Sequence, residues 1–304
     1  MDNQYYIADV FTREKFNGAQ IAVFPKAEHL NDSQMQLLAR ELNLSETVFV
    51  SADKTNKNQF RTRIFSPQNE IDFAGHPIIA TAYVLASCGE LKLTDGHNPI
   101  TLEQNTGLVE VSITSDNGKP NFVQFSQQVS SVVDRFAPSD QELSDLLSID
   151  SKQIDTKKYS ARLVSCGFPY LIVPVFNYET VRNARFNYTA WSLSTAPQSA
   201  AQEILLFSEK NPHQDANFNA RLLGPSIGIN EDPPVGSAMT AFASYLTSFD
   251  QTQEGTHTFA VDRGDDQNRR SVLNLEMVHK KGSPLKVRIG GEAVLVAEGR
   301  IATP

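Results

Sequence analysis

Residues 75–85 read GHPIIATAYVL, and as a helix this segment would be apolar on nearly every face. Its flanking residues suit a helix, because Pro77 is tolerated in a first turn and Gly89 follows as a helix terminator. A helix without a polar face must be buried on all sides by other structure. Since β-rich stretches occur nearby at 60–65 and 71–73, the sequence predicts a sheet curled around a central helix.

A second copy of this segment occurs at 236–246, which read GSAMTAFASYL. The two copies align without gaps and share four identities, beginning with Gly75 on Gly236. Upstream, RIFSP at 63–67 resembles RLLGP at 221–225, and the connection that follows is three residues longer in the second copy. Although two strand-to-helix junctions can look alike by chance, the shared order of strand, proline turn, glycine and apolar helix favours a duplicated α+β unit.

A polar cluster at 115–120, SDNGKP, predicts the crossing between the two halves, because such clusters form turns and connections. The first half would then span 1–118 and the second 119–304. The last strand, within about 286–304, could pack back on the first half.

Two further helix starts can be recognised from capping boxes, in which a side chain and a backbone amide bond each other reciprocally. Asn31 with Gln34 predicts one helix, and Ser139 with Glu142 predicts another. Trp191 is expected to fill core rather than to stack on a ligand.

The composition is that of an ordinary globular protein. With 304 residues, 40% hydrophobic and 20% charged, the chain has room for two domains. A net charge of -8 argues against nucleic acid as a partner. Only Cys88 and Cys166 occur, without a C-x-x-C pair, which argues against disulfides or zinc and fits a cytoplasmic protein. We find no secretion signal and no run of about 20 apolar residues, so membrane insertion is not expected.

Sequence motifs for cofactors are missing as well. No phosphate loop, G-x-G-x-x-G or H-E-x-x-H pattern occurs, so neither a nucleotide or flavin cofactor nor a metal is expected. Residues 224–228, GPSIG, satisfy the nucleophile-elbow pattern, but residues 230–234 follow where that turn needs a helix. A serine hydrolase is therefore disfavoured.

The two predicted helix starts carry the candidate binding groups. Each would present open amide groups and the positive end of a helix dipole, which favour a carboxylate. If the two halves face each other, these ends would line one cleft. His76 lies at the first start, and Asp232 and Ser237 lie near the second. A histidine there can exchange protons near neutral pH, and a simple bond to backbone is the plainer alternative.

Glu46 is the candidate acid-base group. It begins a predicted strand and shares a face with Val48 and Val50. If that face points inward, burial raises the pKa of the carboxyl group, as a proton-shuttling group requires. The alternative is a solvated carboxylate at a strand end, because buried acids are rare.

Three segments resemble one known family. They are 45–47 (SET), 70–77 (EIDFAGHP) and 228–238 (GINEDPPVGSA), which look like the signature segments of the phenazine-biosynthesis isomerase (PhzF-like) family. The resemblance spans essentially the whole chain. It implies the diaminopimelate epimerase fold, an α+β fold of two pseudo-symmetric halves, each a sheet curled around a central helix, with the active site between them. It also implies a cofactor-independent isomerase that forms a homodimer.

The resemblance implies a role for each candidate side chain. A glutamate at the position of Glu46 would move a proton on a small, cyclic, carboxylate-bearing substrate. The reaction characterised for the family is isomerisation of trans-2,3-dihydro-3-hydroxyanthranilate. His76, Asp232 and Ser237 would contact the substrate or help to transfer protons.

By the same resemblance, the amides near Gly75 and Gly236 would hold the substrate's carboxylate. Related amino-acid epimerases use two cysteines, one in each half, as paired acid and base. In this chain the residues before the two glycines are Ala74 and Val235, which excludes two-cysteine epimerisation.

The chain also departs from the family's pattern. Residues 18–20 read Gly-Ala-Gln where Gly-Asn-Pro is usual, and 234–235 read Pro-Val where Ala-Thr is usual. These departures bear on the identity of the substrate more than on the fold. Two alternatives stay open: a non-catalytic metabolite-binding or interaction protein, and a racemase that uses Glu46 and Asp232 as two bases.

Overall fold

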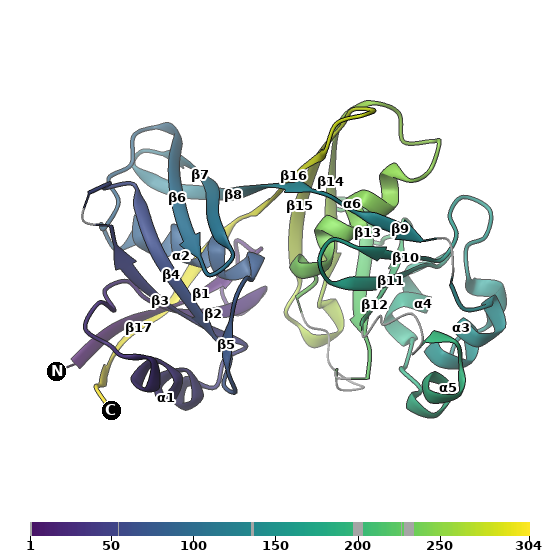
Figure 1. Ribbon diagram of the computed structural model, residues 1–304, viewed down its shortest axis with the longest axis horizontal. Helices are drawn as coiled ribbons and strands as arrows, with labels where there is room; N and C mark the ends of the chain where they lie inside the picture. The colour runs from purple at the N-terminus through teal and green to yellow at the C-terminus, as the bar shows by residue number, and fades with distance from the viewer. Residues whose placement is uncertain (1, 54, 135–136, 197–202, 226, 228–233) are drawn as a thin grey trace. The chain divides into compact units, whose positions relative to one another are not determined.

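The computed structural model describes residues 2–53, 55–134, 137–196, 203–225, 227 and 234–304 (Figure 1). The chain divides into two compact units. The first comprises Met1–Gln127 and Arg288–Pro304, and the second comprises Gln128–Val287. Among the described residues, no helix is long and apolar enough to cross a lipid bilayer.

The first unit is built on one curled sheet. Its strands are β1 (Asp2–Val10), β2 (Ala19–Phe24), β3 (Glu46–Ala52), β4 (Gln59–Phe65), β5 (Glu70–Ile71), β6 (Gly96–Gln104), β7 (Gly107–Asp116), β8 (Lys119–Val129) and β17 (Ala293–Ala302). In space they pair in the order β17, β1, β2, β3, β4, β6, β7 and β8, with β5 added to β4. The β2–β3 and β4–β6 pairs are parallel, and the other pairs are antiparallel.

Helix α2 (Gly75–Ser87) is the central helix of the first unit, and eleven of its thirteen residues are buried. It contacts β1, β2, β3, β7 and β17, which lie on several sides of it. The predicted enclosed helix is therefore confirmed, since this sequence offers no polar face to water.

Helix α1 (Asp32–Leu42) packs against β3 and β4. Its predicted capping box at Asn31 is confirmed. Met35 and Leu38 of this helix join a cluster that includes Phe24 and Phe49, whose rings stack at 4.8 Å. This cluster anchors the crossover that leads from β2 to β3.

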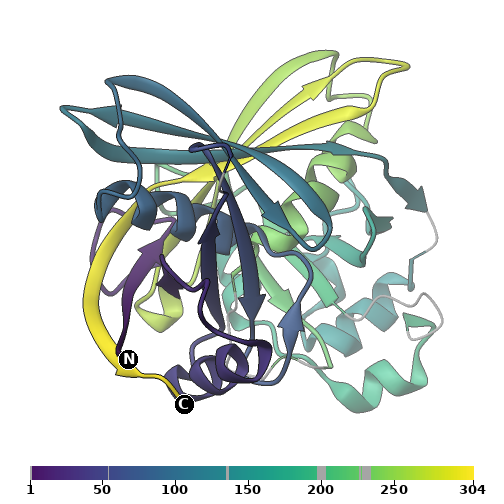
Figure 2. The same cartoon turned by 60° about the vertical axis from the view of Figure 1, so that its left-hand side comes forward.

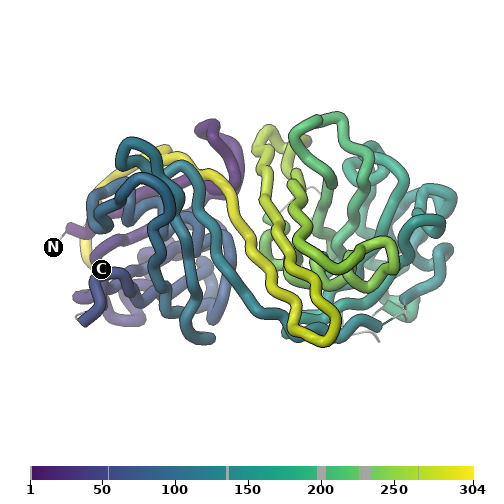
Figure 3. Tube along the Cα trace, turned by 90° about the horizontal axis from the view of Figure 1, so that it is seen from above, coloured from purple at the N-terminus to yellow at the C-terminus, as the bar shows by residue number. Residues whose placement is uncertain are grey.

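The two ends of the chain lie side by side in the first unit (Figures 2 and 3). Strands β1 and β17 pair in antiparallel register along their length. The amide group of Asn3 donates hydrogen bonds to the Ile301 carbonyl oxygen at 3.2 Å and to the Thr303 hydroxyl at 3.0 Å. The last strand thus packs on the first half of the chain.

The second unit has its own sheet and helices. Its strands are β9 (Val132–Asp134), β10 (Arg162–Ser165), β11 (Pro169–Pro174), β12 (Glu203–Ser208), β13 (Phe218–Leu223), β14 (Gly255–Arg263) and β15 (Ser271–His279), followed by β16 (Leu285–Gly291) at the junction of the units. Its helices are α3 (Asp140–Leu147), α4 (Tyr178–Asn183), α5 (Tyr188–Leu193) and α6 (Met239–Thr247), with short 3-10 turns η1 (Ser151–Gln153), η3 (Gly236–Ala238) and η4 (Asp265–Gln267). Strands β9 to β15 pair in chain order.

Helix α6 is the central helix of the second unit. Its Phe242 ring lies 4.9 Å from that of Phe207 and 5.2 Å from that of Phe218. Helices α3, α4 and α5 contribute to a different buried cluster, in which Trp191 is 5% exposed. The prediction that Trp191 fills core is confirmed.

The two units repeat one topology. Each begins with an antiparallel hairpin, β1–β2 or β10–β11, followed by a helical crossover to a parallel strand, β3 or β12. An antiparallel strand, β4 or β13, then leads to the central helix, α2 or α6. A second parallel strand, β6 or β14, and its antiparallel partner, β7 or β15, complete the repeat. The predicted α+β fold of two pseudo-symmetric halves is confirmed. The start of the central helix differs between the copies, because η3 precedes α6 where the sequence predicts a continuous helix from Gly236.

The junction of the units lies after Gln127 rather than in the polar cluster at 115–120. That cluster is the hairpin turn between β7 and β8. Asn117 and Gly118 both have positive φ, 51° and 69°, as a two-residue Asn-Gly hairpin requires. Strand β8 then runs from this turn to Val129, two residues beyond the end of this segment of the first unit.

Two glycines offer a matched test of this backbone. Gly18 and Gly118 have φ of 66° and 69°, but a Cβ on Gly18 would lie 2.1 Å from the Val10 carbonyl oxygen, whereas one on Gly118 meets nothing within 4 Å. Gly118→Ala should lower the free energy of unfolding by about 1 kcal/mol, the cost of left-handed backbone. Gly18→Ala should lower it by about 1–3 kcal/mol more, because of the clash. Urea unfolding of both variants measures the difference, and equal losses would contradict the prediction.

Candidate active site

A carboxylate and an imidazole meet where β3 and α2 begin. Glu46 is the first residue of β3 and lies on the same face as Val48 and Val50, which are fully buried. His76 is the second residue of α2, which packs against β3. His76 Nε2 lies 2.8 Å from Glu46 Oε2, and the two side chains are 8% and 13% exposed. The sequence-predicted pair is thus brought together in the first unit.

Ser45 completes this arrangement from the residue before β3. Its hydroxyl group donates to Glu46 Oε2 at 2.6 Å, so Ser45 and His76 bind the same carboxylate oxygen. No hydrogen bond from the described residues reaches Oε1. One oxygen of Glu46 is therefore held in place, and the other is open to a ligand. The sequence signal for Ser45 is only its place in the SET segment.

The electrostatics of Glu46 differ from the sequence-based expectation. Burial raises the pKa of its carboxyl group, as predicted, but the charge and hydrogen bond of His76 and the Ser45 hydrogen bond outweigh burial. The net result is a pKa below the ordinary glutamate value. The predicted direction was wrong because the imidazole stabilises the ionised form. At neutral pH the carboxylate is ready to accept a proton.

The ring of His76 depends on this contact for its orientation. Its Nδ1 is buried and has no hydrogen-bond partner among the described residues, so its one bond to the protein is the bond to Glu46. Changing either partner should therefore disturb the other.

The first turn of α2 has no side-chain cap. Ala74 is its N-cap residue and Pro77 has no amide hydrogen, so the amides of Gly75 and His76 are first-turn donors without a partner among the described residues. A Cβ on Gly75 would lie 2.9 Å from the ring of Phe125, which explains why a glycine occupies this position. This geometry is compatible with the predicted carboxylate binding near Gly75, which stays a prediction.

The second unit holds the other predicted residues. Gly236 is buried at the start of η3, and the exposed Ser237 follows it. The side chain of Ser237 pairs with the hydroxyl group of Tyr170, a residue that the sequence did not single out. Asp232 lies outside the described residues, so its predicted role has no structural counterpart here.

The two thiols lie elsewhere. Cys88 is at the C-cap of α2, and Cys166 lies in the turn between β10 and β11, with its Sγ 3.6 Å from the Ser244 hydroxyl group. Both are free, and burial raises the pKa of each. The described residues contain no group of three His, Cys, Asp or Glu side chains that could hold a metal ion.

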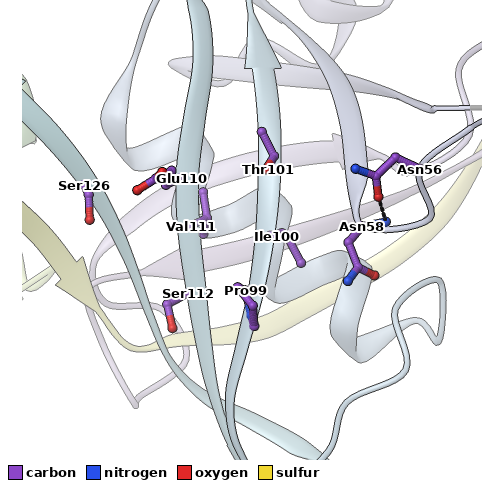
Figure 4. Close-up of a pocket in the computed structure, with 9 residues that line it drawn as sticks. All are labelled: Asn56, Asn58, Pro99, Ile100, Thr101, Glu110, Val111, Ser112 and Ser126. Atoms are coloured by element: carbon purple, nitrogen blue, oxygen red, sulfur yellow. Dashed lines mark hydrogen bonds between the residues drawn. The ribbon is translucent and has the colours of Figure 1, made fainter.

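A pocket on the first unit is separate from these residues (Figure 4). It is lined by Asn56, Asn58, Pro99, Ile100, Thr101, Glu110, Val111, Ser112 and Ser126. Its lining has one carboxylate and no histidine, and no predicted site residue belongs to it. It therefore lacks the acid-base pair found at Glu46.

Comparisons with known proteins show the family and the fold. A model of the family described as "Phenazine biosynthesis-like protein" matches residues 8–299. The chain is 32% identical to an uncharacterized isomerase of Mesorhizobium japonicum over 98% of both chains. It is 27% identical to the trans-2,3-dihydro-3-hydroxyanthranilate isomerase of Pseudomonas chlororaphis, over 98% of this chain and 99% of that one. Its fold is similar to that of a PhzF-family protein of Bacillus anthracis, with a TM-score of 0.84 and 20% identity over 99% of each chain.

Replacing the imidazole should reverse the pKa shift of Glu46. In His76→Ala the burial of the carboxyl group largely persists while its main stabilising partner is lost, so the pKa of Glu46 should rise. A ¹³C NMR titration of glutamate-labelled protein, assigned with Glu46→Gln, measures the change. His29→Ala, which removes a histidine bonded to Asn3, is the control. An unchanged pKa in His76→Ala would refute this account of the pair.

Proposed function

The chain belongs to the phenazine biosynthesis-like family and is an isomerase, and on that premise we propose that it moves a proton within a small, carboxylate-bearing substrate without a cofactor. The observation that carries the proposal is the geometry of Glu46. Oε2 accepts hydrogen bonds from Ser45 and His76, while Oε1 has no partner among the described residues. An ionised carboxylate with one open oxygen is suited to take a proton from carbon and to return it.

The proposed reaction uses one carboxyl group twice. Glu46 Oε1 accepts a proton from a substrate carbon, and the C–H electron pair moves into the conjugated system so that a double bond shifts. The same carboxyl group then protonates a different carbon. No atom is gained or lost, and Glu46 ends as the carboxylate it began as. His76 and Ser45 hold the carboxylate through both transfers.

The uncapped start of α2 supports the proposed substrate class. Uncapped amide groups at a helix N-terminus favour an anion, and we assign the substrate's carboxylate to the amides near Gly75. We assign Gly236 and Ser237 to substrate binding as well. Relatives named trans-2,3-dihydro-3-hydroxyanthranilate isomerase make a cyclic carboxylate the first compound to test.

The departure at residues 18–20 lies close to the proposed base. The Ser45 hydroxyl group that binds Glu46 is also 3.5 Å from the carbonyl oxygen of Gln20. A change from the family's usual residues at this place would alter the surroundings of the substrate rather than the base. We therefore propose a substrate related to, but distinct from, that of the phenazine enzymes, and a homodimeric assembly as in the family.

Glu46→Gln tests the proposed base. Ligands found by thermal-shift screening of small cyclic and amino carboxylates would be assayed for turnover by NMR. Glu46→Gln should lower kcat by about 10²–10⁴-fold, because the amide cannot accept the proton, while melting temperature and ligand binding persist. Glu41→Gln, an exposed glutamate on α1, is the control. Full activity of Glu46→Gln would remove Glu46 from the mechanism, and binding without turnover by the wild type would favour a binding protein.

The fate of an isotope label tests the path of the proton. A substrate deuterated at the donor carbon should keep part of its deuterium in the product when the reaction runs in ordinary water, because one carboxyl group carries it. A racemase with two bases would instead introduce solvent hydrogen at a stereocentre and leave the double bonds in place. NMR of the product distinguishes the two outcomes.

A further inference from the structure

The start of α2 depends on the chain that precedes it. Ala74 provides no side-chain cap, whereas α1 begins with a capping box. Strand β5, which pairs with β4, has only two residues. Among the described residues, the side-chain hydrogen bond nearest to α2 along this preceding chain is made by Asp72. Apart from the packing of Gly75 on the Phe125 ring, the chain is therefore held at residues 70–72 as it enters α2.

Asn105 joins these residues to a neighbouring turn. It lies in the hairpin turn between β6 and β7. Its amide nitrogen donates to Glu70 Oε1 at 3.1 Å and to Asp72 Oδ1 at 3.3 Å. Its amide oxygen accepts a hydrogen bond from Arg61 of β4. One side chain thus connects β4, the β6–β7 turn and the segment that leads into α2.

The charges around Asn105 favour a neutral donor at this position. Arg63 donates two hydrogen bonds to Glu70, of 2.9 and 2.7 Å, and these two side chains are 23% and 28% exposed. Two arginines, Arg61 and Arg63, meet four carboxylates in this cluster, those of Asp32, Glu70, Asp72 and Glu103. An amide nitrogen can donate to two carboxylate oxygens at once, whereas a further negative charge would be repelled by them.

On the premise of the proposed isomerase reaction, we propose that Asn105 is a positioning residue, which holds residues 70–72 so that α2 begins where His76 contacts Glu46. Asp72 lies three residues before the helix, within about 11 Å of its start, so a shift of Asp72 is carried into the first turn. The bond between His76 Nε2 and Glu46 Oε2 is 2.8 Å long and weakens steeply with displacement. Asn105 acts through this segment, since its own hydrogen bonds go to other residues.

Two variants and a matched control test the positioning role. Asn105→Ala removes the donor, and Asn105→Asp places a carboxylate against two others. Asn105 is exposed and has no positive φ, so both changes are compatible with the backbone. The control Asn117→Asp makes the same change in the turn at the other end of β7, where the amide of Asn117 donates to Asp116 at 3.1 Å. Thermal melts check that each variant folds.

The titration of Glu46 reports its contact with His76 without any substrate. In the wild type this contact lowers the pKa of Glu46. The ¹³C titration of glutamate-labelled protein, assigned with Glu46→Gln, should show a higher pKa in Asn105→Ala and a still higher one in Asn105→Asp, because repulsion adds to the loss of the donor. Asn117→Asp should titrate as the wild type does. An unchanged Glu46 in both Asn105 variants would overturn the proposal.

Turnover of trans-2,3-dihydro-3-hydroxyanthranilate, the probe, gives the second readout. We expect kcat to fall about tenfold in Asn105→Ala and about 10²-fold in Asn105→Asp, because a small misplacement of catalytic groups is costly, and to stay at the wild-type value in Asn117→Asp. Wild-type kcat in Asn105→Asp, or an equal loss in Asn117→Asp, would overturn the positioning role.

The two readouts separate this inference from the proposed function. Full activity of Glu46→Gln, or a wild type that does not convert the probe, would count against the proposed function. The titration would then still decide whether Asn105 sets the contact between His76 and Glu46. Loss of activity in Glu46→Gln together with wild-type turnover and titration in both Asn105 variants would refute only this inference.

Discussion

The enclosure of α2 is the constraint on which the first unit depends. A helix without a polar face is stable only where other structure covers it, so the strands curl around it. Because the helix is covered along its length, its first turn lies against the start of β3, and His76 meets Glu46 at 2.8 Å instead of facing water. The same first turn has no side-chain cap. Packing of the helix thus gathers a carboxylate, an imidazole and uncapped amide groups at one end.

Duplication of this fold places two glutamates at equivalent positions, Glu46 at the start of β3 and Glu203 at the start of β12. The pKa of Glu46 is lowered and that of Glu203 is raised. The backbone fixes the position of each carboxyl group at the start of a strand beside a central helix. The residue at the start of each central helix then affects the protonation of the carboxyl group in its unit. His76 stabilises the carboxylate of Glu46, whereas Ser237 does not stabilise that of Glu203. One duplicated scaffold can therefore hold a carboxyl group with a lowered pKa in one copy and a carboxyl group with a raised pKa in the other.

Features that depend on neighbours in sequence could be predicted, and those that depend on distant partners could not. The capping boxes of α1 and α3 form as expected, since they need only residues three apart. The polar cluster at 115–120 was misassigned because an Asn-Gly pair is equally a linker or a hairpin turn until its flanking strands are known to pair. The sign of the Glu46 shift depends on an imidazole 30 residues away. The sequence did not reveal that Glu203, the first residue of β12, corresponds to Glu46. The crossovers before β3 and β12 differ in length and in their helices, so an alignment of the two copies without gaps cannot extend across them.

The places of the two thiols decide between carboxylate and thiol chemistry. Cys88 lies twelve residues after His76, at the other end of α2, which at about 1.5 Å per residue separates their backbones by about 18 Å. Cys166 lies in a hairpin turn beside Ser244, and burial raises its pKa, so it stays a thiol. The positions before the two helix-start glycines carry Ala74 and a buried Val235, neither of which exchanges a proton. The proposed proton transfer therefore rests on Glu46, whose carboxyl group has a lowered pKa and one oxygen without a partner among the described residues.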